Sequence, residues 1–318
     1  NFGCRVNAAE SNQFAQYLLD HPSSKPIIFV NTCAVTQKGE YESLARVRAL
    51  SQQYPNFQII VSGCADLSKI AHLPNVTLYH DKDKLSPIYT PKIKDKFSHS
   101  QKYLLKIQSG CTANCSYCIV PQKRPHLWSL PIDQAVDTVN RAIKHNYQHL
   151  IITGVNLVQY RYDLNNLLKS LLTQTKIPLI SFGSLPLSCI NQEFINLITS
   201  NRSRFVNFLH IPVQSGSDKI LKSMHRPYTQ QQIITTFTKL QNRGFDFGTD
   251  IIVGFPNETD DDFLQTQNLC QLIGFSKIHT FRFSPRPNTE AQELYRQFPV
   301  KPSITNSRAQ QIRKFIIK

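Results

Sequence analysis

The chain has 318 residues, 41% hydrophobic and 18% charged, a composition typical of a folded protein and not of a disordered or fibrous one. No stretch approaches about 18 uninterrupted apolar residues and no charged-then-apolar leader is seen, so we expect a cytoplasmic protein without a membrane partner. The 36 Lys+Arg residues outnumber the 21 Asp+Glu residues and give a formal net charge of +15. This charge favours a polyanionic partner such as RNA, and a basic enzyme without such a partner is the alternative.

The first 80 residues alternate short apolar runs with a helical pattern. The runs Ile27–Val30 and Phe57–Val61 predict two buried strands. Between them, apolar residues recur at helical spacing at Leu44, Val47 and Leu50. This order predicts a βαβ unit, and we expect residues 1–80 to form a Rossmann-like N-terminal domain.

Three cysteines accompany these elements. Each predicted strand runs into a cysteine, Cys33 or Cys64, and Cys4 follows Gly3 near the start of the chain. Open parallel sheets place their ligands at the carboxyl ends of strands. We therefore expect the three thiols to converge on one edge of the sheet.

Residues 81–101 are polar, basic and rich in proline and serine, which predicts a linker and a domain boundary. From residue 102 onward, strand-like and helix-like stretches alternate. The predicted strands are Tyr103–Gln108, His149–Thr153, Leu179–Gly183, Val206–Ile211, Gly248–Val253 and Ser276–Phe283. Strands that alternate with crossover helices predict an α/β fold with a parallel sheet, either doubly wound or an incomplete barrel. Periodicity alone does not decide between the two.

Two of the intervening helices have recognisable starts. Residues 131–144 carry apolar side chains on one face, and Pro131 suits the first helical position. Thr259 with Asp262 three residues later is typical of a capping box before Phe263.

The sharpest local signal is a cluster of cysteines after the first of these strands. Cys111, Cys115 and Cys118 have the spacing C-x3-C-x2-C, and in a long chain without a leader reduced thiols for metal binding or catalysis are favoured. Thiolates are the usual ligands of iron–sulfur clusters, and three of them leave one iron of a cubane cluster open. A zinc site would need a fourth ligand, for which His126 is nearby. Unrelated buried thiols are the remaining alternative.

The cysteine loop and several other stretches of the chain resemble a known protein family. The cysteine loop, with Tyr117 just before its last cysteine, resembles the signature of radical S-adenosylmethionine enzymes, and the whole chain resembles the methylthiotransferases. The matching stretches are Phe2–Asn7, Asn31–Thr36, Ser62–Ala65, Gly110–Pro121, Thr153–Asn156, His210–Ser217, Met224–Arg226, Thr249–Pro256 and Phe283–Pro287.

The resemblance implies a division of the chain and an activity. It implies an N-terminal methylthiotransferase domain over 1–80, a partial (β/α)6 radical SAM barrel over 102–290 and a basic helical tail over 291–318. The residues of Phe2–Asn7 and Asn31–Thr36 are similar to those of the branch that acts on N6-threonylcarbamoyladenosine beside the anticodon of tRNA. Action on isopentenyladenosine in tRNA or on a ribosomal protein is one alternative. A basic iron–sulfur RNA-binding protein without catalysis is another.

The resemblance also implies the cofactors. Cys111, Cys115 and Cys118 would hold a [4Fe-4S] cluster whose open iron chelates S-adenosyl-L-methionine. A deoxyadenosyl radical formed there would take a hydrogen atom from C2 of the modified adenine. A second [4Fe-4S] cluster, carrying the sulfur to be inserted, would be held by Cys4, Cys33 and Cys64. A second S-adenosylmethionine would supply the methyl group.

Further contacts are expected at strand ends, where barrel enzymes bind their ligands. The residues expected to contact S-adenosylmethionine or adenine are Tyr117, Gly154, Asn156, Ser184, Gln214 and Asp250. For those in loops, the alternative is that they are turn-forming residues and bind no ligand. Arg226 and Arg286 are candidates for phosphate contact, or else solvated charges. The expected partners are tRNA and a low-potential electron donor such as a flavodoxin-type protein, and we expect a monomer.

Two regions depart from the family pattern. In residues 123–129, Trp128 stands where the family usually has an arginine and Pro125 where it usually has a glycine, which puts the geometry of this loop in doubt. Relatives commonly add a small C-terminal β-barrel that binds tRNA, whereas this chain stops at Lys318. We therefore expect RNA affinity to rest on the barrel face, the linker lysines and a basic helix with Arg308, Arg313 and Lys314, or else the sequence is truncated.

Overall fold

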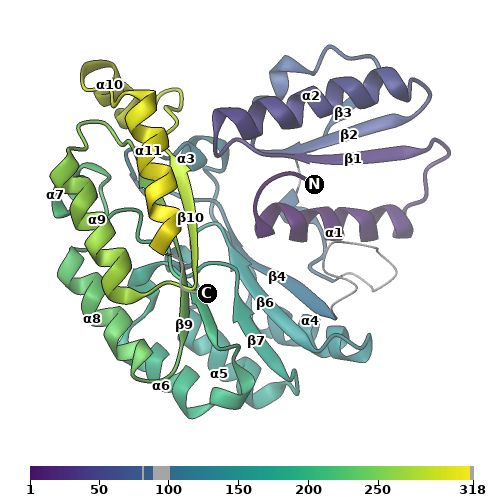
Figure 1. The fold of residues 1–318 in the computed structure, drawn as a ribbon. Helices are drawn as coiled ribbons and strands as arrows, with labels where there is room; N and C mark the ends of the chain where they lie inside the picture. Colours follow the sequence, from purple (N-terminus) through teal and green to yellow (C-terminus); the bar gives the residue numbers. More distant parts are fainter. Residues whose placement is uncertain (81, 89–100, 316–318) are drawn as a thin grey trace. The chain divides into compact units, whose positions relative to one another are not determined.

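A computed structural model describes residues 1–80, 82–88 and 101–315. The chain divides into two compact units, one of Asn1–Thr112 with Val120–Ile180 and the other of Ala113–Ile119 with Ser181–Lys318 (Figure 1). Most of the linker predicted over 81–101 lies outside the described residues, as do the last three residues of the predicted tail. The α/β class predicted from the sequence is confirmed, because parallel sheets occur in both units.

The first unit begins with a parallel sheet of order β1-β2-β3. Its elements are α1 (Arg5–Asp20), β1 (Ile27–Thr32), α2 (Gln37–Gln53), β2 (Gln58–Gly63) and β3 (Val76–Leu78). The predicted βαβ unit is therefore present, with α2 as the crossover between β1 and β2. Val47, Ile59 and Val61 are fully buried between this helix and the sheet.

A second sheet in this unit has the order β5-β4-β6-β7. Its elements are β4 (Lys102–Ser109), α3 (Val120–Lys123), β5 (Trp128–Ser129), α4 (Ile132–Lys144), β6 (His149–Gly154), α5 (Leu164–Gln174) and β7 (Leu179–Phe182). Strand β4 pairs in parallel with β6 and is buried over almost its whole length, as expected for a parallel strand covered on both faces.

Helix α1 is the structural link between these two sheets. Phe14 packs with Ile60 under the first sheet, whereas Ala8 packs with Leu104 and Ile151 of the second. Figure 1 shows α1 and α2 on opposite faces of the β1-β2-β3 sheet. A helix covered on two sides also buries polar side chains, and these need hydrogen-bond partners within the protein.

The second unit is built on a parallel sheet of order β10-β9-β8. Its elements are α6 (Gln192–Ser200), β8 (Phe208–His210), α7 (Asp218–Ser223), α8 (Gln230–Gln241), β9 (Asp246–Val253), α9 (Asp260–Ile273), β10 (Lys277–Arg282), α10 (Glu290–Gln297) and α11 (Pro302–Ile312). Phe237 lies edge-on to Phe247 and Phe275, with ring centroids 4.8 and 5.4 Å apart, in the core between α8 and the sheet.

Several predictions of local structure need correction. Helix α1 and the short strands β3 and β5 were not predicted, because α1 lacks a one-sided apolar stripe and the two strands have at most three residues. Pro131 precedes α4 as its N-cap and does not occupy the first helical position. The predicted strands otherwise coincide with β1, β2, β4 and β6 to β10 within a few residues.

The C-terminal residues are helical as predicted, but the RNA contact expected of Arg308 needs correction. Residues 290–312 form two helices, α10 and α11. Arg308 is 4% exposed and its guanidinium lies 2.7 Å from both the Glu258 and the Asp260 carboxylates. This arginine therefore pairs within the fold and is not available to a nucleic acid.

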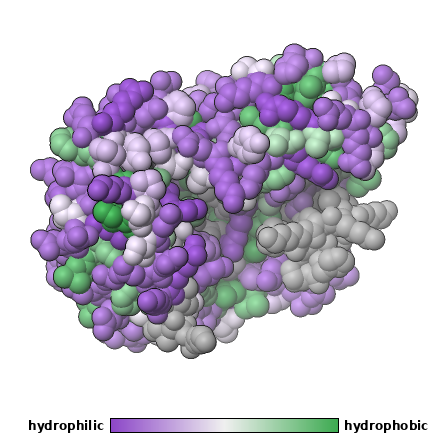
Figure 2. Space-filling model, turned by 45° about the horizontal axis from the view of Figure 1, so that its top comes forward, coloured by the Kyte–Doolittle hydropathy of each residue, from purple (hydrophilic) through white to green (hydrophobic). Residues whose placement is uncertain are grey.

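Two observations describe the surface. Among the described residues, no helix has the length and apolar composition needed to cross a lipid bilayer. Hydrophilic residues cover most of the face shown in Figure 2, and hydrophobic residues occur there in scattered groups. This face offers hydrogen-bonding groups rather than one continuous apolar patch.

The capping box predicted at the start of α9 is confirmed. Thr259 and Asp262 bond to each other's backbone, and Asp262 also accepts hydrogen bonds from Lys219 (2.7 Å) and Ser217 (2.7 Å). Burial by itself raises the pKa of the Asp262 carboxyl, but the donors from Lys219, Thr259 and Ser217 outweigh it and lower the pKa to about 2.

We predict that Asp262→Asn destabilises the protein by about 2 kcal/mol at pH 7. The pKa of Asp262 is lower in the folded state than in the unfolded state, so its stabilisation is present above about pH 4 and is lost as the pH falls toward 2. Urea denaturation at pH 7 and pH 3 should show a smaller difference between wild type and variant at the lower pH. Asp261→Asn, at an exposed position in the same turn, is the control and should change the free energy of unfolding only slightly.

Candidate functional site

Three cysteines of the first unit lie on segments that are hydrogen-bonded to one another. Cys33 follows β1, Cys64 follows β2, and Cys4 is the N-cap of α1. The Cys64 N–H donates to the Thr32 carbonyl at 3.1 Å, and the Asn7 amide donates to the same carbonyl at 2.8 Å. The fold thus ties the start of α1 to the ends of two neighbouring strands.

The thiols are close enough to affect one another's ionisation. Burial raises the pKa of Cys4 and Cys33, and the negative charge of Cys64 raises both further. Three neighbouring thiolates therefore need a cation to offset desolvation and repulsion. A soft metal centre supplies that charge, so the donor set fits an iron–sulfur cluster.

Arg124 is buried beside these cysteines. Its guanidinium donates to both oxygens of Glu10 (2.7 and 2.8 Å), to Asn7 Oδ1 (2.9 Å), to Ser109 Oγ (3.1 Å) and to Cys64 Sγ (3.2 Å). Burial alone lowers the pKa of this arginine, but the Glu10 carboxylate more than compensates and the pKa is raised. Arg124 therefore stays charged next to Cys64.

Lys106 adds a second cation to this network. Its ammonium lies 3.4 Å from Glu10 and 3.0 Å from Asp83, and 4.9 Å from the centre of the Trp128 ring. Lys106 is 1% exposed, so the pair with Glu10 is screened from water. Trp128, in the stretch that departs from the family pattern, thus has a structural contact within the fold.

Cys111 lies in the same unit and is held from two directions. Its N–H donates to the Arg124 carbonyl at 2.9 Å, and the Asn156 amide lies 3.6 Å from its sulfur. Gln108 accepts from the Asn156 N–H at 2.8 Å and is paired with Gly154 across β4 and β6. The structure therefore brings together Cys111, Asn156 and Gly154, three of the residues predicted for the site.

Cys115 and Cys118 belong to the second unit, where a turn joins them through a Cys118 N–H to Cys115 carbonyl bond of 3.0 Å. Arg226 donates to Cys115 Sγ at 3.5 Å and to Tyr228 Oη at 2.8 Å. Arg226 is half-buried and bonded to Tyr228 and Cys115, so it is not a fully solvated charge, and its contact with phosphate stays a prediction. Arg286 is 2% exposed and is not a solvated charge either.

Tyr117 packs against a buried cluster of the second unit that includes Met224 and Phe255. Burial raises the pKa of its phenol, so the side chain is neutral at ordinary pH. Its ring is therefore part of the support of the cysteine turn.

Asp250, on β9, is the centre of a polar group in the second unit. Its Oδ1 lies 2.9 Å from His210 Nε2 and 3.1 Å from His279 Nδ1. A carboxylate between two imidazoles can fix the position of the proton on each ring.

Gln214 is attached to β9 next to this group. Its N–H donates to the Asp250 carbonyl and its carbonyl accepts from the Ile252 N–H, both at 2.9 Å, so that it forms an isolated parallel bridge with Ile251. Gln214 has a φ of +71°. A positive φ is uncommon for a residue other than glycine and is often found at functional sites.

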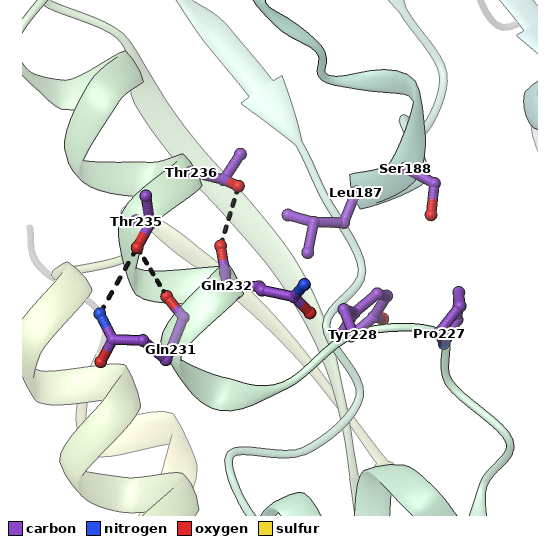
Figure 3. A pocket seen from close by; sticks show the side chains of 8 residues that line it. All are labelled: Leu187, Ser188, Pro227, Tyr228, Gln231, Gln232, Thr235 and Thr236. Atoms are coloured by element: carbon purple, nitrogen blue, oxygen red, sulfur yellow. Dashed lines mark hydrogen bonds between the residues drawn. The ribbon is translucent and has the colours of Figure 1, made fainter.

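Ser184 follows β7 at a half-buried position. A separate pocket of the second unit lies between α8 and the segment after β7, with Leu187, Tyr228 and Gln232 on its wall (Figure 3). On the wall formed by α8, Thr236 Oγ1 donates a hydrogen bond to the Gln232 carbonyl of the same helix at 2.8 Å. Of the residues predicted to bind a cofactor, none lines this pocket.

Four residues of these groups were not predicted from the sequence: Glu10, Gln108, Arg124 and His279. Arg124 lay in the stretch described only as a departure from the family, and the other three had no local motif. The sequence signal for Glu10 is that this acidic residue lies close to Cys4. Its role becomes clear only from its burial on α1.

We predict that Gly63→Ala destabilises the protein by more than about 3 kcal/mol, since Gly63 precedes Cys64 with φ +114° and a Cβ there would lie 2.3 Å from the Thr32 backbone. The two strands would have to separate where the cysteines are held. Gly244→Ala is the matched control, because Gly244 also has positive φ (+75°) but no atom within 4 Å of the new Cβ. It should cost about 1 kcal/mol in urea denaturation, and equal losses for the two variants would contradict the account.

The chain is similar to known proteins in sequence and in fold. Residues 105–270 match the Radical SAM superfamily, and residues 1–78 match a family described as Uncharacterized protein family UPF0004. Threonylcarbamoyladenosine tRNA methylthiotransferase MtaB of Thermotoga maritima is 32% identical over 92% of this chain and 76% of its own length. The tRNA-2-methylthio-N(6)-dimethylallyladenosine synthase of Bdellovibrio bacteriovorus is 25% identical over 94% of this chain and 75% of its own length.

Solved structures agree on the fold. The radical S-adenosylmethionine methyltransferase TsrM of Kitasatospora setae has a TM-score of 0.60 with 11% identity, over 90% of this chain and 69% of that one. At this identity the likeness concerns the fold alone. Together with the sequence relatives and the two family matches, it shows that the chain belongs to the radical SAM methylthiotransferase family.

Proposed function

We propose that the chain is a tRNA methylthiotransferase that attaches a methylthio group to C2 of N6-threonylcarbamoyladenosine. Relatives named for threonylcarbamoyladenosine are 27% to 32% identical to it, and the two at 32% are those from Thermotoga maritima and Chlamydia pneumoniae. Relatives named for dimethylallyladenosine are 25% to 28% identical. The formal net charge of +15 further supports a polyanionic substrate such as tRNA.

Membership of the radical SAM superfamily implies a [4Fe-4S] cluster and S-adenosylmethionine. We assign that cluster to Cys111, Cys115 and Cys118, and a second [4Fe-4S] cluster to Cys4, Cys33 and Cys64. The observation that carries the proposal is the second set: three thiols from separate segments lie together, with a buried guanidinium donating to one of them. A protein with radical chemistry alone needs no such second thiol set.

The remaining residues are assigned to binding and orientation. When bound, the cluster and S-adenosylmethionine supply the radical and the methyl group. Asn156 orients Cys111 through its amide, and Arg226 orients Cys115. Tyr117, Gly154, Ser184, Gln214 and Asp250 are proposed to contact S-adenosylmethionine or the adenine.

Asp250 also bonds to two histidines. Its Oδ1 lies 2.9 Å from His210 Nε2 and 3.1 Å from His279 Nδ1, so one nitrogen of each ring is engaged by the carboxyl group. The other ring nitrogen of His279, Nε2, belongs to a side chain that is 46% exposed. We assign to this nitrogen a hydrogen bond to the adenine during the reaction.

The proposal extends to the partners and to the division of the chain. A low-potential electron donor such as a flavodoxin-type protein would reduce the clusters, and the chain would act as a monomer. Residues 1–80 would carry the second cluster, and residues 102–290 the radical chemistry.

The test is anaerobic reconstitution with iron and sulfide, followed by incubation with S-adenosylmethionine, a reductant and tRNA. We expect deoxyadenosine and a methylthio group on threonylcarbamoyladenosine, identified by mass spectrometry of the nucleosides. A methylthio group on dimethylallyladenosine instead would move the chain to that branch. Deoxyadenosine without a modified nucleoside would point to a protein substrate, and clusters without deoxyadenosine to a non-catalytic iron–sulfur protein.

Two single variants separate the assigned roles. Cys115→Ala should abolish deoxyadenosine formation, because it removes a ligand of the cluster that binds S-adenosylmethionine. Cys33→Ala should retain deoxyadenosine formation and lose the methylthio product, because it affects only the second thiol set. Loss of both products in Cys33→Ala, with iron still bound at the other set, would contradict the division of roles.

A further inference from the structure

Each of the two thiol sets has an arginine that donates to one of its sulfurs. Arg124 donates to Cys64 at 3.2 Å in the first unit, and Arg226 donates to Cys115 at 3.5 Å in the second. The two differ in burial: Arg124 is 8% exposed, whereas Arg226 is half-buried. The two arginines therefore offer the same kind of contact in different surroundings.

Arg124 is also bonded to both sequence motifs that carry the cysteines. Its side chain reaches Asn7 and Cys64, which belong to the N-terminal thiol set and its support. Its backbone carbonyl accepts the N–H of Cys111, the first cysteine of the other set. One residue thus holds Cys64 by its side chain and Cys111 by its main chain.

We propose that Arg124 is a positioning residue for the second cluster, which fixes Cys64 and raises the reduction potential of that cluster. This inference rests on the proposed function, since it requires a cluster on Cys4, Cys33 and Cys64. The residue touches a ligand sulfur and not the substrate. Its effect is therefore on the stability and the potential of the cluster.

The physical basis is the charge-assisted hydrogen bond to sulfur. Reduction adds negative charge to a cluster, and a cationic donor stabilises the more negative state. Hydrogen bonds to the sulfurs and solvent exposure are established determinants of iron–sulfur potentials. Loss of such outer contacts commonly weakens metal binding by roughly 10- to 100-fold.

The contacts of Arg124 require a guanidinium. Its nitrogens donate simultaneously to Glu10, to two neutral side-chain oxygens and to Cys64. A lysine has a single ammonium with three donors and lacks the planar fork. We therefore expect Arg124→Lys to keep the charge near Glu10 but to lose the bond to Cys64.

The experiment isolates the second cluster in full-length protein. In the variant with Cys111, Cys115 and Cys118 all changed to alanine, only the N-terminal thiol set remains. We compare this parent with the same protein carrying Arg124→Met or Arg124→Lys. The readouts are the midpoint potential from an EPR-monitored redox titration and the rate of iron release to a chelator.

We expect both Arg124 variants to have a lower midpoint potential and about tenfold faster iron release than the parent. Because Arg124→Met leaves the buried Glu10 with one cation fewer, a second variant controls for misfolding. Glu10→Gln with Arg124→Met removes both charges, and Lys106 keeps Asp83 as a partner. The double variant is compared with Glu10→Gln alone. If the two are equally stable but the double variant has the lower midpoint potential, the loss of Arg124 at Cys64 is responsible.

Arg226→Met is the reciprocal variant, measured where Cys4, Cys33 and Cys64 are all alanine. It should lower the potential of the other cluster, for which Arg226 is the donor. Unchanged potential and iron release in the folded Arg124 variants would overturn the inference while leaving the proposed function intact. Absence of iron from the parent with only the N-terminal thiols would overturn both.

Discussion

The buried ion pair between Glu10 and Arg124 is the contact on which the first unit depends. Glu10 is fully buried on α1, and Arg124 follows α3 at the end of the cysteine loop, so the pair joins two distant parts of the sequence. Removing one partner of such a pair typically costs about 3–5 kcal/mol, because the other charge is left buried. The same arginine donates to Cys64, so the stability of the fold and the placement of a candidate ligand are linked.

A second constraint is the cost of gathering thiolates. Burial and mutual repulsion raise the pKa of Cys4 and Cys33, so these groups favour the neutral thiol when no cation is bound. Cluster binding reverses this preference and releases protons. Arg124 offsets part of the negative charge of the thiolates but cannot replace a metal, since it donates to only one of the three sulfurs among the hydrogen bonds described.

Much of this arrangement could be predicted from the sequence. Strands β1, β2, β4 and β6 were indicated by apolar runs, and Thr259 with Asp262 marked the start of α9. The cysteines were found by spacing and by resemblance. Arg124, Glu10 and His279 were not predicted as a site, because their roles arise from contacts between residues far apart in the chain. Helix α1 was not predicted for a different reason: it is covered on both sides, so its buried polar residues conceal the usual amphipathic pattern.

The central claim is that the chain holds two separate clusters on two thiol sets. The most direct measurement is a Mössbauer spectrum of the anaerobically reconstituted, isotope-enriched protein, together with the iron content per chain. The account predicts about eight irons per chain, all in [4Fe-4S] clusters, and about four after either thiol set is changed to alanine. About four irons in the wild type, lost completely when Cys111, Cys115 and Cys118 are replaced, would contradict it.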